Sequence, residues 1–442
     1  MNKLSLETKN CCNTWYMQSF SVLRKVAFIH QAESQTENLK LPLWAILEKN
    51  SKVDEDGFHI WEEDIIFHGN NKENLISERT ARKDLNSRWP QGKIPYKIDR
   101  SLNSQESKSA ISQAMQLWMD GTCVNFVNSP TIRNQPHLVL KHTGTGCNSW
   151  VGIYDEHTTD QTVSLDQPGC STSVPTVAHE LGHAIGLWHE QDRLDRNSHL
   201  NVYTTNMGDN KIYFETANDD VMNYDVPYEY SSLMQYTPDA FSSNGKLTLV
   251  PKDPMAFPLM GNAQKITYLD FKLVNRMYNC SDKCQNPPTC QNGGYATWNT
   301  KKGCRCECPP GFSGPNCQNR VYVAPPCGGK ITTPTRFQSP NYPNNHPADL
   351  RCAWLIEAPR GKVPTLSFHD FNLMARAGAE NKCYWSALRI RNGNLLGDDP
   401  GQIHCADELN HNAIRGKSNQ MLLVLTSMYD SARGFDVSVK FA

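Results

Sequence analysis

Three stretches of the chain space their apolar residues as regular secondary structure does. Between Ser104 and Asp120 the apolar residues recur at helical spacing, at Ile111, Met115, Leu117 and Trp118. Leu138 to Leu140 predicts a short buried strand. From Phe435 to Phe441 apolar and polar residues alternate, as in a strand with one buried face. The chain is therefore expected to contain both helices and strands.

A second helix is predicted from about Pro175, because proline fits the first turn of a helix. The apolar positions that would bury this helix are Val177, Ala178, Leu181, Ala184 and Ile185. Gly186 can adopt a positive φ, which would end the helix and turn the chain. The segment therefore predicts a short helix with a defined end.

The same helix carries histidines at the spacing of metal ligands. His179 and His183 are four residues apart, so their imidazoles project from nearly the same face. Glu180 stands between them, close enough to contact a water molecule on the metal. After the turn at Gly186, His189 can reach the same metal from another direction. Three nitrogen ligands leave one coordination position open, which indicates a catalytic rather than a structural zinc ion.

The residues 179 to 189 form the motif H-E-x-x-H-x-x-G-x-x-H, the signature of the metzincin proteases. A bare HExxH is usually a solvated helix face, but Gly186 and His189 at their fixed offsets favour the metal site. The continuation from Glu190 to Arg196 resembles the astacin family, in particular its secreted invertebrate members. From Trp89 to Cys280 the chain resembles an astacin catalytic domain throughout, which implies an α+β fold and one catalytic Zn²⁺.

The resemblance also implies roles for single residues. Glu180 would take a proton from the attacking water and pass it to the departing amine. The segment from Tyr230 to Tyr236 resembles the Met-turn of this family. Within it, Tyr236 would ligate zinc at rest and then bind the oxyanion of the transition state. Met234 would form the floor of the zinc site. Glu190 would receive the new amino terminus after removal of a pro-segment.

Residues 1–83 are polar and charged and end in a basic stretch from Arg79 to Lys83, which suggests a removable pro-segment. In astacin zymogens the aspartate of a Phe-x-Gly-Asp motif occupies the open zinc position. The matching residues here are Phe67 to Asn70, with Asn70 at the switch position. A neutral amide binds zinc more weakly than a carboxylate, so we expect latency either to be leaky or to depend on other contacts. Ser149 to Gly152 resembles the edge strand that pairs with an extended substrate in this family.

The composition limits the remaining classes of function. A chain of 442 residues is too long for one core, so several domains are expected. Its 44 basic and 45 acidic side chains nearly cancel, which argues against nucleic acid as a partner. No apolar run approaches the roughly 20 residues of a membrane span. Sixteen cysteines indicate an oxidising compartment and therefore secretion. The first residues lack the apolar core of a signal peptide, so we expect the true start to lie upstream.

The C-terminal half of the chain resembles two extracellular modules. Residues 282–318 resemble an EGF-like module, although cysteine spacing alone permits 15 connectivities. A Cys/His zinc site is the alternative there, but no histidine is near. Residues 327–442 resemble a CUB domain, an all-β sandwich. The positions that hold calcium in many CUB domains are Met374, Ser386 and Met428 here, so calcium binding is doubtful.

The catalytic domain is assigned to residues 84–281, and the resemblances imply a full pairing of fourteen cysteines. Cys11 and Cys12 remain without partners in this scheme. The implied disulfides are Cys123 to Cys280, Cys147 to Cys170, Cys284 to Cys304, Cys290 to Cys306, Cys308 to Cys317, Cys327 to Cys352 and Cys383 to Cys405.

Two functions remain in competition at this point. The first is a secreted zinc endopeptidase, made as a zymogen, that hydrolyses peptide bonds of extracellular or matrix proteins. Its EGF-like and CUB modules would bind matrix partners. The second is a non-enzymatic adhesion or scaffold protein with an inactive protease domain. The motif is intact, because His179, Glu180, His183, His189 and Tyr236 are all present, and this favours the enzyme.

Overall fold

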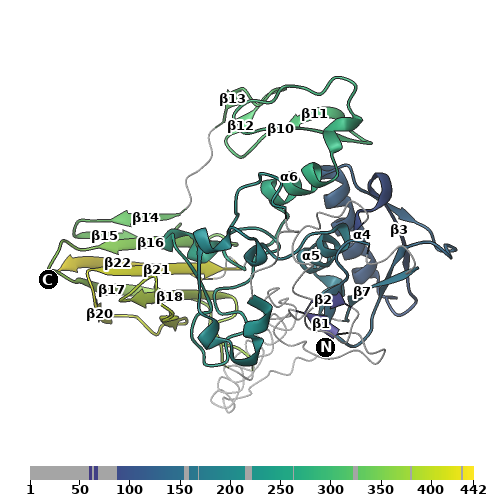
Figure 1. The fold of residues 1–442 in the computed structure, drawn as a ribbon. Coiled ribbons are helices and arrows are strands. Elements are labelled where there is room, and N and C mark those ends of the chain that lie inside the picture. The colour runs from purple at the N-terminus through teal and green to yellow at the C-terminus, as the bar shows by residue number, and fades with distance from the viewer. Residues whose placement is uncertain are drawn as a thin grey trace, which may run out of the picture. The chain divides into compact units, whose positions relative to one another are not determined.

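A computed structural model describes residues 59–61, 64–67, 87–153, 159–167, 169–214, 222–261, 263–321, 327–378, 381–429 and 432–442. All of them belong to one of the two units into which the chain divides, residues 42–442. Elements carry the labels of Figure 1. The predicted switch residue Asn70 and the cysteines Cys11 and Cys12 lie outside the described residues.

A mixed seven-stranded sheet, in the order β1-β2-β6-β7-β5-β3-β4, lies beside the helices α4 and α5 (Figure 1). Its strands are β1 (His59–Trp61), β2 (Ile65–Phe67), β3 (Lys93–Ile98), β4 (Asn125–Asn128), β5 (His137–Lys141), β6 (Cys147–Ser149) and β7 (Asp160–Leu165). Strand β6 runs antiparallel to β7, and β2 pairs with β6 in parallel. The predicted pro-segment therefore contributes the outermost hairpin of this sheet.

Three helices form a common core around Trp118. Helix α4 (Gln105–Gly121) begins at Ser104, whose hydroxyl accepts a hydrogen bond from the Ser107 N–H. The other two are α5 (Val174–Ile185) and α6 (Tyr268–Met277). Trp118 is fully buried, donates from its indole nitrogen to the Ala178 carbonyl at 2.9 Å, and meets the Phe271 ring edge-on at 5.7 Å. The helix predicted between Ser104 and Asp120 is confirmed.

Short elements complete the catalytic region between the helices. Strands β8 (Leu200–Val202) and β9 (Leu249–Pro251) form an antiparallel pair. The 3-10 turns are η2 (Pro90–Gly92), η3 (Cys170–Thr172), η4 (Glu190–Asp192), η5 (Arg196–Ser198), η6 (Thr204–Asn206), η7 (Gly208–Phe214), η8 (Pro254–Leu259) and η9 (Cys280–Lys283). None of the helices among the described residues combines the length and the hydropathy that crossing a bilayer requires.

Two small hairpins follow the catalytic region. They pair β10 (Tyr295–Asn299) with β11 (Gly303–Glu307), and β12 (Phe312–Ser313) with β13 (Asn319–Arg320). Three disulfides hold this segment, which is too small to bury much apolar surface. In all, the described residues form seven disulfides, and these have the pairing that the resemblances implied.

Residues 327–442 form a β-sandwich, as expected. One sheet has the order β14-β16-β21-β18-β19 and the other β15-β22-β17-β20. The strands are β14 (Gly328–Ile331), β15 (Thr335–Gln338), β16 (Arg351–Glu357), β17 (Pro364–Asn372), β18 (Ser386–Asn392), β19 (Gln402–His404), β20 (Ala413–Arg415), β21 (Gln420–Ser427) and β22 (Gly434–Phe441). Trp354, Phe368 and Phe435 are buried between the sheets. Met374 and Ser386, two of the positions that hold calcium in many CUB domains, contact each other here, because the Ser386 hydroxyl accepts the Met374 N–H at 2.8 Å.

Candidate metal centre

Helix α5 holds its histidines rigidly because both of its ends are defined. The Ser173 hydroxyl caps the first turn by accepting the Thr176 N–H. The helix ends at Gly186, whose φ of 122° lies in the region that favours glycine. Every residue from Thr176 to Ile185 is buried. His179, Glu180 and His183 therefore lie on a short helix with little freedom to move.

The three histidines predicted as ligands converge on one point. The Nε2 atoms of His179 and His183 lie 3.1 Å apart. The His183 and His189 rings meet at 4.7 Å, nearly perpendicular to each other. All three side chains are almost completely buried. The turn at Gly186 thus brings His189 to the two helical histidines, as the motif predicted.

The hydrogen bonds made by the Nδ1 atoms show which ring nitrogen of each histidine faces the centre. The Nδ1–H of His179 donates to the Leu233 carbonyl, and the Nδ1–H of His183 donates to the Leu187 carbonyl, each at 2.8 Å. A carbonyl oxygen can only accept, so Nδ1 carries the proton in both neutral rings. Nε2 then presents a lone pair to the centre. His189 has the carboxylate of Asp192 3.7 Å from its Nδ1.

This donor set fits a zinc ion. Lone pairs of neutral imidazoles repel one another at 3.1 Å unless a cation lies between them, and imidazole nitrogen is a preferred zinc ligand. Outer contacts from Nδ1 to carbonyl or carboxylate oxygens are typical of metal-binding histidines. Glu180 is fully buried, and neither of its carboxylate oxygens has a hydrogen-bond partner among the described residues. Burial, followed by the negative charge of Asp64, raises its pKa well above the usual value.

The predicted Met-turn packs against helix α5, which bears the histidines. A Cβ atom on Gly182 would come within 3.0 Å of the Met234 Sδ, so the absence of a side chain at Gly182 allows this close approach. Tyr236 is nearly buried, and its ring centroid lies 4.2 Å from that of His189. The structure therefore brings both residues to the centre, where the sequence interpretation put them.

A carboxylate that the sequence interpretation missed completes the centre. Asp64 lies in the turn of the hairpin β1-β2 and is fully buried. Its Oδ2 is 3.1 Å from Nε2 of both His179 and His189, and its Oδ1 accepts a hydrogen bond from the Tyr236 hydroxyl at 3.1 Å. The ligand atoms of Asp64 and the three histidines all lie within 4.8 Å of one another.

The electrostatics agree with an ionised carboxylate at this position. Burial alone would raise the pKa of Asp64, but positive charge at the histidine cluster, first of all at His189, lowers it well below the usual value. Asp64 thus offers the centre a charged oxygen ligand, as a divalent cation prefers.

The sequence interpretation assigned this position to Asn70, six residues later along the chain. Asn70 lies outside the described residues, whereas Asp64 is at the centre. A signal was present in the sequence, because Trp61 precedes Asp64 at the same aromatic-x-x-acid spacing as in Phe-x-Gly-Asp. The glutamate at residue 63, in place of glycine, obscured the match.

The hairpin also occupies the predicted substrate edge. Ile65 of β2 pairs with Ser149 of β6, and the Ser149 N–H donates to the Asp64 carbonyl at 2.8 Å. Of the predicted edge from Ser149 to Gly152, only Ser149 belongs to strand β6 (Cys147–Ser149), since residues 150–152 leave the sheet. The unpaired backbone groups that an incoming peptide would use are therefore bonded to this chain's own segment.

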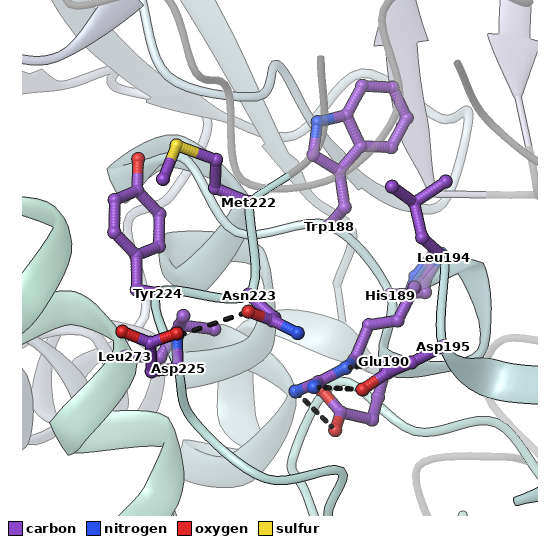
Figure 2. A pocket seen from close by; sticks show the side chains of 11 residues that line it. Trp188, His189, Glu190, Leu194, Asp195, Met222, Asn223, Tyr224, Asp225 and Leu273 are labelled. Atoms are coloured by element: carbon purple, nitrogen blue, oxygen red, sulfur yellow. Dashed lines mark hydrogen bonds and ion pairs between the residues drawn. The ribbon is translucent and has the colours of Figure 1, made fainter. Parts of the chain in front are cut away.

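Glu190 lines a cavity of about 230 Å³ beside the centre, together with Trp188, Arg193, Tyr224 and Asp225 (Figure 2). Its Oε1 accepts hydrogen bonds from the Glu229 N–H at 2.7 Å and from Arg193 at 3.3 Å. Burial raises the pKa of Glu190 to about 8, although the charge of Arg193 opposes this. Arg193 also donates to the Val226 carbonyl and to Asp195, so it fixes the loop that follows His189.

Comparison with known proteins gives the centre a family context. Residues 81–279 match the model of the astacin peptidase family, and residues 327–439 match that of the CUB domain. The zinc metalloproteinase dpy-31 of Teladorsagia circumcincta is 32% identical over 375 residues, which are 82% of this chain and 59% of that protein. Blastula protease 10 of Paracentrotus lividus is 32% identical over 80% of this chain and 60% of its own length.

The chain thus spans about three fifths of the length of these curated relatives. Among solved structures, the hatching enzyme zinc-protease HCE-1 of the medaka Oryzias latipes is 28% identical with a TM-score of 0.38. That match covers 47% of this chain and 96% of the medaka chain.

We predict that the full chain binds one zinc ion and that His189→Ala weakens this binding by more than about 100-fold. Loss of an outer-sphere partner alone costs about 10- to 100-fold, and His189 contributes a ligand. His199→Ala is the matched control, because His199 stacks on Tyr228 away from the centre. Metal analysis after dialysis against a graded chelator measures both variants. Equal zinc retention by the two would contradict the assignment.

Proposed function

Since this chain belongs to the astacin family of peptidases and also carries a CUB domain, we propose that it is a secreted zinc endopeptidase, made as an inactive precursor, that cleaves extracellular proteins. The observation that carries the proposal is the convergence of three imidazole nitrogens beside the buried carboxylate of Glu180, which has no hydrogen-bond partner among the described residues. We assign residues 1–83 to the pro-segment, 84–281 to the catalytic domain, 282–318 to an EGF-like module and 327–442 to the CUB domain.

The chemistry divides between the metal and the side chains around it. A zinc ion on His179, His183 and His189 supplies a Lewis acid that lowers the pKa of water and polarises a carbonyl group. Glu180 accepts the proton of the attacking water and delivers it to the departing amine. Burial, the largest cause of its raised pKa, favours acceptance of that proton.

Tyr236 is proposed to stabilise the oxyanion of the reaction. Its hydroxyl already reaches a negatively charged oxygen near the centre, because it donates to Asp64 Oδ1 at 3.1 Å. After Asp64 leaves, the same hydroxyl can donate to the oxyanion that develops on the substrate carbonyl. The freed edge of β6 then offers its backbone groups to an extended peptide.

Latency in this proposal depends on Asp64 rather than on Asn70. The carboxylate takes the metal position that a substrate carbonyl needs, and β2 takes the strand edge. One hairpin thereby blocks both parts of the substrate site. Removal of the pro-segment would release both at once.

Maturation is proposed to fill the cavity at Glu190. A buried carboxyl group with a raised pKa lacks a sufficient counter-charge, and an incoming ammonium group would provide one. The new amino terminus, created beyond the basic stretch Arg79 to Lys83, carries such a group. This supports the role that the astacin resemblance implied for Glu190.

We predict that Glu180→Gln in the processed protein lowers kcat/KM by about 10²- to 10⁴-fold while one zinc ion stays bound. Glutamine keeps the shape but cannot accept the proton of water. The matched control is Glu106→Gln, an exposed residue of the first turn of α4. Cleavage of denatured protein, read together with metal content, provides the measurement. Unchanged proteolysis in Glu180→Gln would favour the alternative, a non-enzymatic scaffold with a contaminating activity.

We predict that Asp64→Ala raises the activity of the unprocessed chain at least about tenfold, because the closed arrangement loses its metal ligand. Asn70→Ala should leave the activity unchanged. Hydrolysis of a quenched fluorescent peptide before any processing, with chain length checked by mass, measures both. The opposite pattern, activation by Asn70→Ala alone, would return the switch to residue 70.

A further inference from the structure

Asp270, in the first turn of α6, holds the Met-turn from the side opposite the metal. It is 4% exposed. Its Oδ1 accepts the Ser232 hydroxyl at 2.6 Å. Its Oδ2 accepts the Leu233 N–H and the Thr267 N–H, each at 3.0 Å. Three donors converge on this carboxylate, which therefore holds the Ser232 hydroxyl and the peptide unit between Ser232 and Leu233.

The backbone carbonyls of the same segment accept hydrogen bonds from the parts of the chain that bear the zinc ligands. The Leu233 carbonyl accepts the Nδ1–H of His179 at 2.8 Å. The Met234 carbonyl accepts the backbone N–H of Glu190, the residue directly after His189, at 2.9 Å. The Leu233 carbonyl belongs to the same peptide unit as the Met234 N–H, which donates to the Ser232 hydroxyl, and that hydroxyl donates to Asp270.

We propose that Asp270 is a positioning residue for the metal centre, acting through the Ser232 hydroxyl and the peptide unit between Leu233 and Met234 on the ring orientation of His179. It touches neither substrate nor metal. A carboxylate suits the position because it only accepts hydrogen bonds, and all three neighbouring groups donate. The side-chain amide of an asparagine at this position would turn its NH₂ group, a donor, toward at least one of these three donors. This inference rests on the proposed zinc site.

Asp270 also has a purely structural role, and the test must separate the two. With Thr267 it forms the capping box of α6, in which each side chain accepts the other's backbone N–H. A capping residue alone would change the melting temperature and leave the hold on zinc unaltered. Removal of a partner that orients a ligand weakens metal binding by about 10- to 100-fold.

The experiment compares Asp270→Asn with Val274→Ala in the full chain loaded with zinc. Val274 is fully buried in the same helix and makes no polar contact with the Met-turn, so its truncation lowers stability only. Both variants should lose melting temperature. Asp270→Asn should also release zinc to a chelator about 10 to 100 times faster than wild type, and Val274→Ala at an unchanged rate.

A milder variant keeps the test usable if Asp270→Asn does not fold. Ser232→Ala removes one donor to Asp270 and the acceptor of the Met234 N–H. It should show intermediate acceleration of zinc release. Equal release rates for all variants would overturn the inference, whereas a wild-type chain without zinc would overturn the proposed function instead.

An independent observation points to a modification site after α6. Asn279-Cys280-Ser281 is the one Asn-X-Ser/Thr sequence, with X other than proline, in the 442 residues. Asn279 is exposed and has left-handed backbone angles, φ 49° and ψ 46°. Such sequences accept N-linked oligosaccharide in secreted proteins.

We infer that Asn279 carries an N-linked oligosaccharide, which rests on the proposed secretion. In this transfer the Asn279 amide nitrogen bonds to the sugar's anomeric carbon and loses a proton. The bond from that carbon to a lipid diphosphate breaks, and the diphosphate leaves with the electron pair. Cys280, the middle residue of this sequence, is buried in its disulfide with Cys123, whereas Asn279 beside it is exposed.

Expression of the full chain behind an added signal peptide, in a secreting animal cell, tests this site. The full chain should appear in the medium, and peptide N-glycosidase should lower its mass and convert Asn279 to aspartate, as read by peptide mass. Asn279→Gln should remove the shift. Unmodified Asn279 in chain recovered from the medium or from the secretory pathway of the cell would overturn the inference.

Discussion

Three imidazole nitrogens brought to one buried point form the constraint on which the rest of this structure depends. The Nε2 lone pairs of His179 and His183 face each other at 3.1 Å, an arrangement that a cation stabilises and that neutral rings alone do not. Much of the local structure serves this convergence. The capped helix α5 carries two of the rings, and Gly186 turns the chain to bring the third. Carbonyls of Leu187 and Leu233 hold the helical rings in the tautomer that binds metal.

The same centre explains why the N-terminal hairpin folds against the catalytic sheet. A buried carboxylate such as Asp64 is costly unless it has partners, and here it meets three histidines and the Tyr236 hydroxyl. Strand β2 then completes the hydrogen bonding of the edge strand β6. Both contacts use groups that the proposed reaction requires, so latency and catalysis exclude each other by geometry.

The features of the structure that depend on local residue spacing could be predicted from the sequence. The ligands of α5, the turn at Gly186 and the helix after Ser104 follow from residue periodicity and from the conformations that glycine permits. The pairing of cysteines came from resemblance, since spacing alone left 15 connectivities open for six of them. Asp64 was missed because its approach to His179 spans 115 residues and its motif lacks the expected glycine. Asp270 is equally invisible in sequence, because its role appears only where α6 meets the Met-turn.

X-ray absorption at the zinc edge of the full, unprocessed chain tests the central claim most directly. The account predicts a first shell of three nitrogen atoms and carboxylate oxygen at about 2.0 to 2.2 Å, with the outer-shell scattering of three imidazole rings. In the Asp64→Ala chain the three-ring signal should persist while the oxygen contribution changes. A shell with sulfur, or with fewer than three imidazoles in the wild-type chain, would contradict the account.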